Sequence, residues 1–268
     1  MIGAIVGDVI GSVHEGSGTK TKEFPLFVED SRFTDDTVLT VAVAEKLLHG
    51  GEYVNRFHRY FHLYPLAGFG GTFIRWAGTF EREPYNSWGN GSAMRVSPVG
   101  IAFDTLEDVM SHARQSADVT HNHPEGVRGA QATAVAVFLA RTGKSKDEIR
   151  SHIESEFGYD LSARLDDIRP GYAFDVSCQG SVPQSLVAFL ESESYEDAVR
   201  NAISLGGDAD TMAAIAGAVA EAFYGGVPEH IAAPALERLD GRLRAIVNEF
   251  SRVFGHKIWH KPPRKTHS

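Results

Sequence analysis

Hydrophobic residues recur at intervals of three and four positions along much of this 268-residue chain. The pattern is clearest over residues 38–48, 130–139, 182–190 and 211–223, and it continues over 236–254. Because this spacing places apolar side chains on one face of an α-helix, we predict helices in these segments. Glycines follow several segments, at positions 50–51, 143 and 225–226, where a left-handed residue commonly ends a helix. No convincing alternation of polar and apolar residues predicts a strand.

Two long segments, residues 63–99 and 157–183, lack this periodicity. Both are rich in residues that favour turns, and long loops inside a domain are often functional. The first segment contains glycine-dense stretches at 67–72 and 87–95. Glycine lets backbone N–H groups approach a ligand closely, and successive N–H groups can bind a phosphate. Tight turns without any ligand explain the same composition equally well.

Two short acidic clusters lie far apart in the sequence, and each precedes a predicted helix. Their members are Thr34, Asp35, Asp36, Asp208, Asp210 and Thr211. Carboxylates held close together repel one another unless a cation neutralises them, and Mg²⁺ and Mn²⁺ prefer oxygen ligands. The two clusters together therefore predict a divided site for a hard metal. For either cluster alone, an ordinary helix N-terminus remains the alternative, because Thr and Asp are common capping residues.

The composition, with 43% hydrophobic and 23% charged residues, is typical of a globular protein. We predict one domain over residues 1–255 and a basic C-terminal tail over 256–268. The 35 acidic and 26 basic residues give a net charge of −9, which argues against general nucleic-acid binding. The single cysteine, Cys178, excludes an internal disulfide. No leader or long apolar span is recognised, so we expect no membrane association and a cytoplasmic location.

Glycines at positions 3, 7 and 11 have a spacing that suits close helix packing and does not match the dinucleotide-binding fingerprint. Asp8 and Glu15 are seven residues apart, and the simplest interpretation of both is surface acids. His121 and His123 alternate around Asn122, but no further Cys or His cluster completes a zinc or copper site. None of these features alone predicts a function.

Taken in order, the motifs resemble those of the ADP-ribosylglycohydrolase family, which includes dinitrogenase reductase-activating glycohydrolases and ADP-ribosyl-acceptor hydrolases. The matching stretches are Gly7-Asp8-x-x-Gly11-x-x-x-Glu15, Thr34-Asp35-Asp36-Thr37, Gly89-Asn90-Gly91-Ser92-Ala93-Met94-Arg95, Thr120-His121 and Gly206-Gly207-Asp208-x-Asp210-Thr211. They span almost the whole chain. The resemblance implies an all-α, single compact domain whose helices surround a cleft with two Mg²⁺ or Mn²⁺ ions.

The resemblance also implies roles for individual residues. The metal ligands would be Thr34, Asp35, Asp36, Asp208, Asp210 and Thr211. The general acid or base would be Asp36 or Glu15, the latter on a mobile loop near the metals. The substrate contacts would be Gly68, Gly70, Gly71, Ser87, Trp88, Gly89, Asn90, Gly91, Ser92 and His121. Trp88 would stack on adenine, and the alternative is a tryptophan that closes a hydrophobic lid.

The implied activity is metal-dependent hydrolysis of the glycosidic bond between ADP-ribose and its acceptor, which releases ADP-ribose. The acceptor would be a protein side chain, with arginine slightly favoured from family frequency, or a small molecule. Paired cations would orient the ribose hydroxyls and activate a water for attack on the anomeric carbon. Two alternatives stay open: an inactive ADP-ribose-binding protein, and a two-metal phosphohydrolase that acts on a nucleotide diphosphate.

Overall fold

Helices form the regular structure in the computed structural model, which describes residues 1–259. This part of the chain contains no β-strand, although an isolated antiparallel bridge pairs Gly89 with Ser177, and the predicted all-α fold is confirmed. The helices are α1 (Ile2–Gly11), α2 (Asp35–His49), α3 (Tyr53–Leu63), α4 (Gly71–Gly78), α5 (Gly91–Met94), α6 (Ser97–Ala102), α7 (Leu106–Asp118), α8 (Pro124–Arg141), α9 (Lys146–Phe157), α10 (Leu165–Ile168), α11 (Cys178–Leu190), α12 (Tyr195–Ile203), α13 (Ala209–Tyr224), α14 (Glu229–Glu237), α15 (Gly241–Phe254) and α16 (His256–Trp259).

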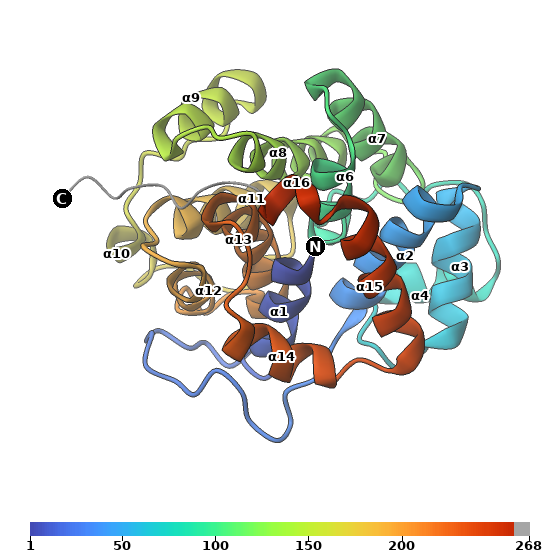
Figure 1. The fold of residues 1–268 in the computed structure, drawn as a ribbon, viewed down its shortest axis with the longest axis horizontal. Coiled ribbons are helices and arrows are strands. Elements are labelled where there is room, and N and C mark those ends of the chain that lie inside the picture. Colours follow the sequence, from blue (N-terminus) through green and yellow to red (C-terminus); the bar gives the residue numbers. More distant parts are fainter. Residues whose placement is uncertain (260–268) are drawn as a thin grey trace.

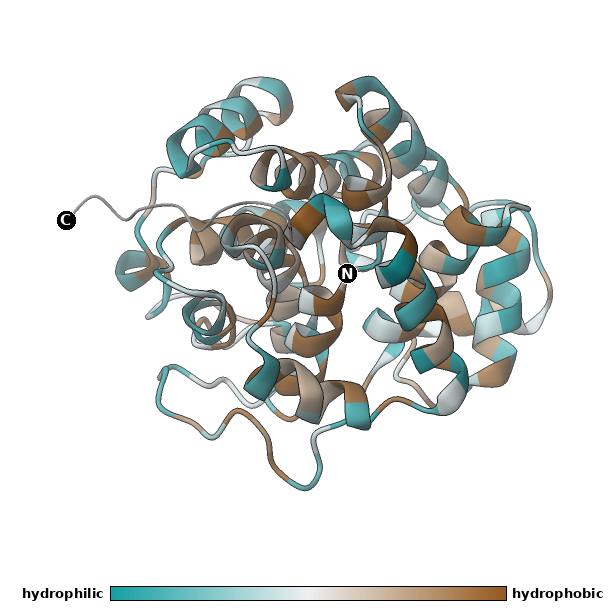
Figure 2. Cartoon of the chain, in the orientation of Figure 1, coloured by the Kyte–Doolittle hydropathy of each residue, from teal (hydrophilic) through white to brown (hydrophobic). Residues whose placement is uncertain are grey.

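Helices α1 and α13 lie together at the centre of the molecule (Figure 1). α13 packs against α1, α8, α11 and α12, while α1 also contacts α2 and α14. Figure 2 shows apolar residues gathered on the central helices and many hydrophilic residues on α3, α7 and α9. From Ala209 to Ala222, all residues of α13 are buried. The start of α13, and any polar group on it, is therefore surrounded by other elements.

Three glycines bring α1 into direct backbone contact with α13. Gly3, Gly7 and Gly11 are four residues apart and share one face of α1. A methyl group on Gly7 would lie 2.5 Å from the carbonyl carbon of Ala213, and one on Gly11 would lie 2.5 Å from the Cα atom of Asp210. The glycine spacing therefore does correspond to close helix packing, and this packing places the end of α1 beside the start of α13.

Gly7→Ala is expected to destabilise the protein by about 3 kcal/mol, because the added methyl group overlaps the backbone of α13. Helix propensity alone would favour alanine by about 1 kcal/mol. Gly241→Ala is the matched control, since Gly241 begins α15 and has nothing within 4 Å of an added methyl group. Urea unfolding should show a loss of stability for Gly7→Ala only. Equal stability of Gly7→Ala and the wild type would show that α1 and α13 are not packed this closely.

Both acidic clusters lie at helix N-termini, as the capping interpretation predicts. Thr34 is the N-cap of α2, and its hydroxyl accepts a hydrogen bond from the N–H of Asp36 at 3.2 Å. Asp208 occupies the N-cap position of α13. The positive end of the helix dipole stabilises acids at both positions. Capping does not exclude a metal site, because both helix N-termini face the same cleft.

The C-terminal region begins with a short helix, α16 (His256–Trp259). The Lys257 ammonium group lies 2.9 Å from both carboxylate oxygens of Asp104, and Ile258 is buried. The rest of the predicted tail, residues 260–268, lies outside the described residues, so the domain boundary stays a prediction. No helix within residues 1–259 is both long and apolar enough to cross a lipid bilayer.

Candidate active site

A cleft with a volume of about 380 Å³ opens where the N-termini of α2 and α13 face the glycine-rich loops. Most of the residues singled out from the sequence line it. These are Glu15, Thr34, Asp35, Asp36, Gly68, Gly70, Gly71, Ser87, Gly89, Asn90, Gly91, His121, Asp208, Asp210 and Thr211. The fold thus brings together segments from both ends of the chain at one site.

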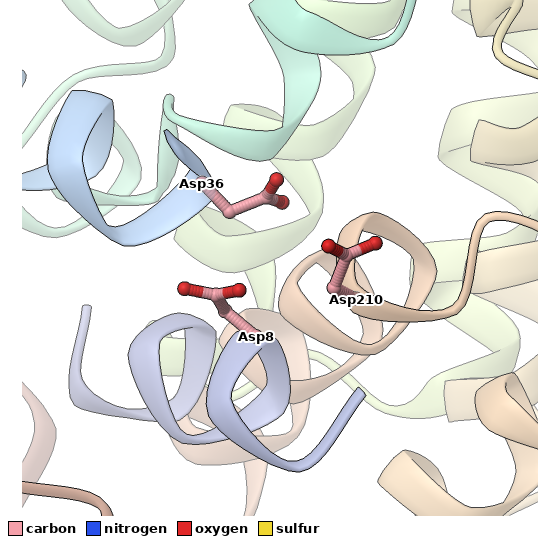
Figure 3. A group of neighbouring side chains, drawn as sticks. All are labelled: Asp8, Asp36 and Asp210. Carbon is pink, nitrogen blue, oxygen red and sulfur yellow. The ribbon is translucent and has the colours of Figure 1, made fainter. Parts of the chain in front are cut away.

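Three buried carboxylates converge where α1, α2 and α13 meet, and two of them, Asp36 and Asp210, line the cleft. Asp8 comes from α1, Asp36 from α2 and Asp210 from α13, and the three side chains point toward one another (Figure 3). One oxygen atom of each lies within 4.8 Å of the others, and oxygens of Glu15, Asp208 and Asp210 form a second group of the same size. Since Asp210 belongs to both groups, the two form one continuous acidic centre.

Burial raises the pKa of Asp36 well above its usual 3.8, and the charges of Asp210 and Asp8 raise it further. Burial also raises the pKa of Asp210, with the Asp208 charge as the next cause. For Asp35, burial and the Asp8 charge raise the pKa to about 8. These carboxyl groups can carry their full charge near neutral pH only if a cation offsets the repulsion.

The donor atoms at this centre suit a hard divalent cation, because they are carboxylate and hydroxyl oxygens. The Oδ1 atom of Asp36 is buried and has no hydrogen-bond partner among the described residues. The Thr211 hydroxyl lies 3.2 Å from the Oδ2 atom of Asp36, which joins the two predicted halves of the site. A buried carboxylate oxygen without a partner is costly, and a bound cation would satisfy it.

The interpretation of Asp8 as a surface acid is wrong, because its side chain is fully buried. Its Oδ1 atom accepts a hydrogen bond from the Thr34 hydroxyl at 2.6 Å, and its Oδ2 atom accepts from the N–H groups of Thr34 at 3.0 Å and Thr37 at 3.1 Å. The Thr37 hydroxyl also donates to Oδ2. Asp8 therefore anchors the first turn of α2. Its position between Gly7 and Gly11, on a helix suited to close packing, was the available signal.

Glu15 lies on the loop between α1 and α2 and, although exposed, faces the cleft. Partial burial of its carboxyl raises the pKa, the Asp208 charge raises it further, and the Arg32 charge lowers it. A raised pKa suits a group that exchanges protons near neutral pH. The interpretation of Glu15 as a surface acid is right about its exposure, but it missed that Glu15 lies beside Asp208 and Asp210.

The glycine loops are attached to the acidic centre by hydrogen bonds. The Nδ2 atom of Asn90 donates to the Oδ2 atom of Asp208 at 2.8 Å and to the Ser181 hydroxyl at 3.2 Å. The N–H of Asp35 donates to the carbonyl oxygen of Ala67 at 2.8 Å. Each loop is thus fixed to one half of the predicted metal site.

Two of the expected substrate contacts do not line the cleft. Trp88 is 48% exposed, and its carbonyl oxygen accepts a hydrogen bond from the N–H of Cys178. Ser92 is fully buried, and its hydroxyl donates to the carbonyl oxygen of Gly126 at 2.6 Å. Tyr85, which the sequence analysis did not single out, does line the cleft. The stacking role of Trp88 stays a prediction.

The two alternating histidines have different surroundings. His121 lines the cleft, whereas the His123 ring caps α8 and accepts a hydrogen bond from the N–H of Glu125 at 3.1 Å. Within residues 1–259, neither residue belongs to a group of side chains that could hold a metal ion.

Comparisons with known proteins agree with the geometry. A family model described as ADP-ribosylglycohydrolase matches residues 1–259. The ADP-ribosylhydrolase ARH3 of Bos taurus is 30% identical, and the match covers 84% of each chain. The ADP-ribosylarginine hydrolase Tri1 of Pseudomonas putida (strain GB-1) is 26% identical, over 84% of this chain and 69% of that protein. A solved "ADP-ribosylglycohydrolase-related protein complex" chain is 25% identical with a TM-score of 0.66, and the match covers 94% of this chain and 96% of that one.

Proposed function

Because the chain belongs to the ADP-ribosylglycohydrolase family, we propose that it is a metal-dependent enzyme that hydrolyses the glycosidic bond between ADP-ribose and its acceptor. The observation that supports this most is the convergence of Asp36 and Asp210 at the end of a cleft lined by glycine loops. A polar centre beside glycine-rich loops suits a ligand that carries both hydroxyl and phosphate groups.

We propose two Mg²⁺ or Mn²⁺ ions as cofactors at the acidic centre. The residues that would hold them are Thr34, Asp35, Asp36, Asp208, Asp210 and Thr211. When bound, the ions would orient the ribose hydroxyls and make a nearby water more acidic. Asp8 would act behind these residues, because hydrogen bonds from Thr34 and Thr37 already occupy its oxygens.

Glu15 is better placed than Asp36 to transfer a proton. The Asp36 carboxylate is buried among other acids, which favours a role as a ligand. The Glu15 carboxyl is exposed in the cleft and can exchange protons with solvent. It would give a proton to the leaving acceptor atom or take one from the attacking water. The carboxyl group also lies close enough to Asp208 and Asp210 to act at a sugar held there.

The diphosphate would bind at the glycine loops. Gly70 and Gly71 are exposed at the N-terminus of α4, where free N–H groups and the helix dipole favour an anion. Gly89 and Gly91, in the second glycine-rich loop, also line the cleft and lie next to His121. This arrangement needs no general basic surface, which agrees with the net charge of −9.

The proposal also names the acceptor, the group from which ADP-ribose is released. The name of one similar protein specifies ADP-ribosylarginine, and we slightly favour an arginine side chain on a protein as the acceptor. A small molecule that carries ADP-ribose is the alternative substrate. A cytoplasmic location is proposed from the single cysteine, which is buried and unpaired.

A product assay tests the activity directly. Purified protein would be incubated with arginine-linked, serine-linked and small-molecule ADP-ribose conjugates, with Mg²⁺, with Mn²⁺ and with EDTA. We expect free ADP-ribose only in the metal-containing reactions. Release of AMP would instead indicate attack on the diphosphate and a phosphohydrolase. Tight ADP-ribose binding without release from any conjugate would indicate an inactive binding protein.

A further inference from the structure

A buried arginine lies behind His121. Arg95 is 0% exposed, and its guanidinium group lies over the Phe57 ring at 4.3 Å. Its Nη2 atom donates to the carbonyl oxygen of Ser116 at 2.7 Å and to the Thr120 hydroxyl at 2.9 Å. Among the described residues, the Nε and Nη1 atoms have no hydrogen-bond partner. A buried charge that is only partly compensated is costly. Such a charge acts strongly on the polar groups next to it.

Thr120 connects this arginine to His121. The Thr120 Oγ1 atom lies 2.7 Å from the Nδ1 atom of His121. A threonine hydroxyl has one proton to donate and two lone pairs. Arg95 can only donate, so it occupies one lone pair. Either Thr120 donates its proton to the Nδ1 atom of His121, or Nδ1 carries a proton and donates it to the second lone pair of Thr120.

The charge of Arg95 decides between these two arrangements. Burial lowers the pKa of Arg95 to about 10, so the guanidinium is still cationic at neutral pH. The cation lies on the Nδ1 side of His121, because both groups contact the Thr120 hydroxyl. The negative end of an imidazole dipole is at the nitrogen without a proton, and a nearby cation favours that end. Thr120 therefore donates its proton to the Nδ1 atom of His121.

The other ring nitrogen of His121 lies next to two glycines that line the cleft. Its Nε2 atom lies 3.2 Å from the position of a methyl group on Gly91 and 3.6 Å from one on Gly89. Burial lowers the pKa of His121 well below 6.5, with the Arg95 charge as the second cause, so the ring is neutral. A neutral imidazole donates a hydrogen bond only from its protonated nitrogen. The oxygens of an ionised diphosphate only accept, so a hydrogen bond from His121 to them needs the proton on Nε2.

We propose that Arg95 and Thr120 are positioning residues that hold His121 as the neutral tautomer with its proton on Nε2, so that it presents one N–H donor to the ligand in the cleft. The identity of the ligand as ADP-ribose rests on the proposed function. The tautomer itself depends only on the three side chains.

Thr120→Val tests this arrangement, because valine keeps the shape of threonine and removes the hydroxyl. The ring ¹⁵N resonances of His121, assigned by comparison with His121→Gln, report which nitrogen carries the proton. In the wild type we expect the proton on Nε2. In Thr120→Val we expect a mixture of tautomers and an ADP-ribose affinity that is about tenfold lower by calorimetry. Thr120→Ser should restore both properties.

Thr133→Val is the matched control, since Thr133 is fully buried and its hydroxyl has no hydrogen-bond partner within residues 1–259. It should leave the His121 resonances and the ADP-ribose affinity unchanged. A proton on Nδ1 in the wild type, or a wild-type tautomer and affinity in Thr120→Val, would overturn the proposal. A wild type that has the expected tautomer but binds no ADP-ribose would instead overturn the proposed function and leave the positioning role intact.

Discussion

Asp210→Asn is expected to abolish hydrolysis, with a fall in kcat/KM of at least about a thousandfold. Asparagine keeps the size of the side chain and can still accept the hydrogen bond from the N–H of Thr211 at 2.9 Å. Asp210 belongs to both clusters of three acidic side chains at the centre. Because the change removes its negative charge, the affinity for Mn²⁺ should also fall. Turnover assays and calorimetric Mn²⁺ titrations would measure the two effects.

The same variant has an opposite expected effect on the metal-free protein. Because the Asp210 carboxylate is buried next to Asp208 and Asp8, its replacement by a neutral group removes repulsion. In EDTA, Asp210→Asn should therefore melt at a higher temperature than the wild type. Asp160→Asn, a change at an exposed loop carboxylate, is the control and should alter neither activity nor melting. Wild-type Mn²⁺ binding by Asp210→Asn would show that this residue is not a ligand.

The stability of the metal-free protein should fall steeply as the pH rises from about 4 to about 8. The folded-state pKa values of Asp35, Asp36 and Asp210 are raised, that of Asp35 to about 8. Between the unfolded and folded values, the native state binds more protons than the unfolded state, so the free energy of unfolding decreases with increasing pH. With three coupled groups, the loss should reach several kcal/mol. Thermal melts in EDTA across this pH range would measure it.

Excess Mg²⁺ or Mn²⁺ should remove most of this pH dependence, because a bound cation replaces the protons that the carboxylates would otherwise hold. The double variant Asp36→Asn, Asp210→Asn provides an internal comparison, since it should show a shallower pH dependence in EDTA. If the metal-free wild type melts at the same temperature at pH 5 and pH 8, the pKa values of the buried carboxyl groups are not raised.

Helical periodicity predicted the long helices well. The predicted segments 38–48 and 211–223 correspond to α2 (Asp35–His49) and α13 (Ala209–Tyr224), and Gly50 and Gly225 follow them with positive φ angles of 72° and 83°. The expectation of irregular structure over 63–99 and 157–183 was partly wrong, because α4, α5 and α10 lie within these segments and α6 and α11 begin in them. Helices of four to eight residues are too short to show a period and depend on tertiary contacts.

Only part of the candidate site was predicted from the sequence. The two acidic motifs gave the residues that we propose as metal ligands, but Asp8 was assigned to the surface and is buried. Helical spacing identifies which residues share a face, but it does not say which face another helix covers. In the glycine-rich loop, Tyr85 lines the cleft and Trp88 does not. Side chains in a loop have no fixed period, so their directions could not be read from the sequence.

The sequence by itself determined the helical class, the positions of the long helices and the two sets of oxygen-bearing side chains, because these depend on local spacing and residue chemistry. Only the tertiary structure decided that Asp8, Asp36 and Asp210 meet, and that Arg95 and Thr120 stand behind His121. These meetings depend on how closely separate helices approach, as the glycine contact of α1 with α13 shows. That distance is set by packing across the whole core, which no single segment encodes.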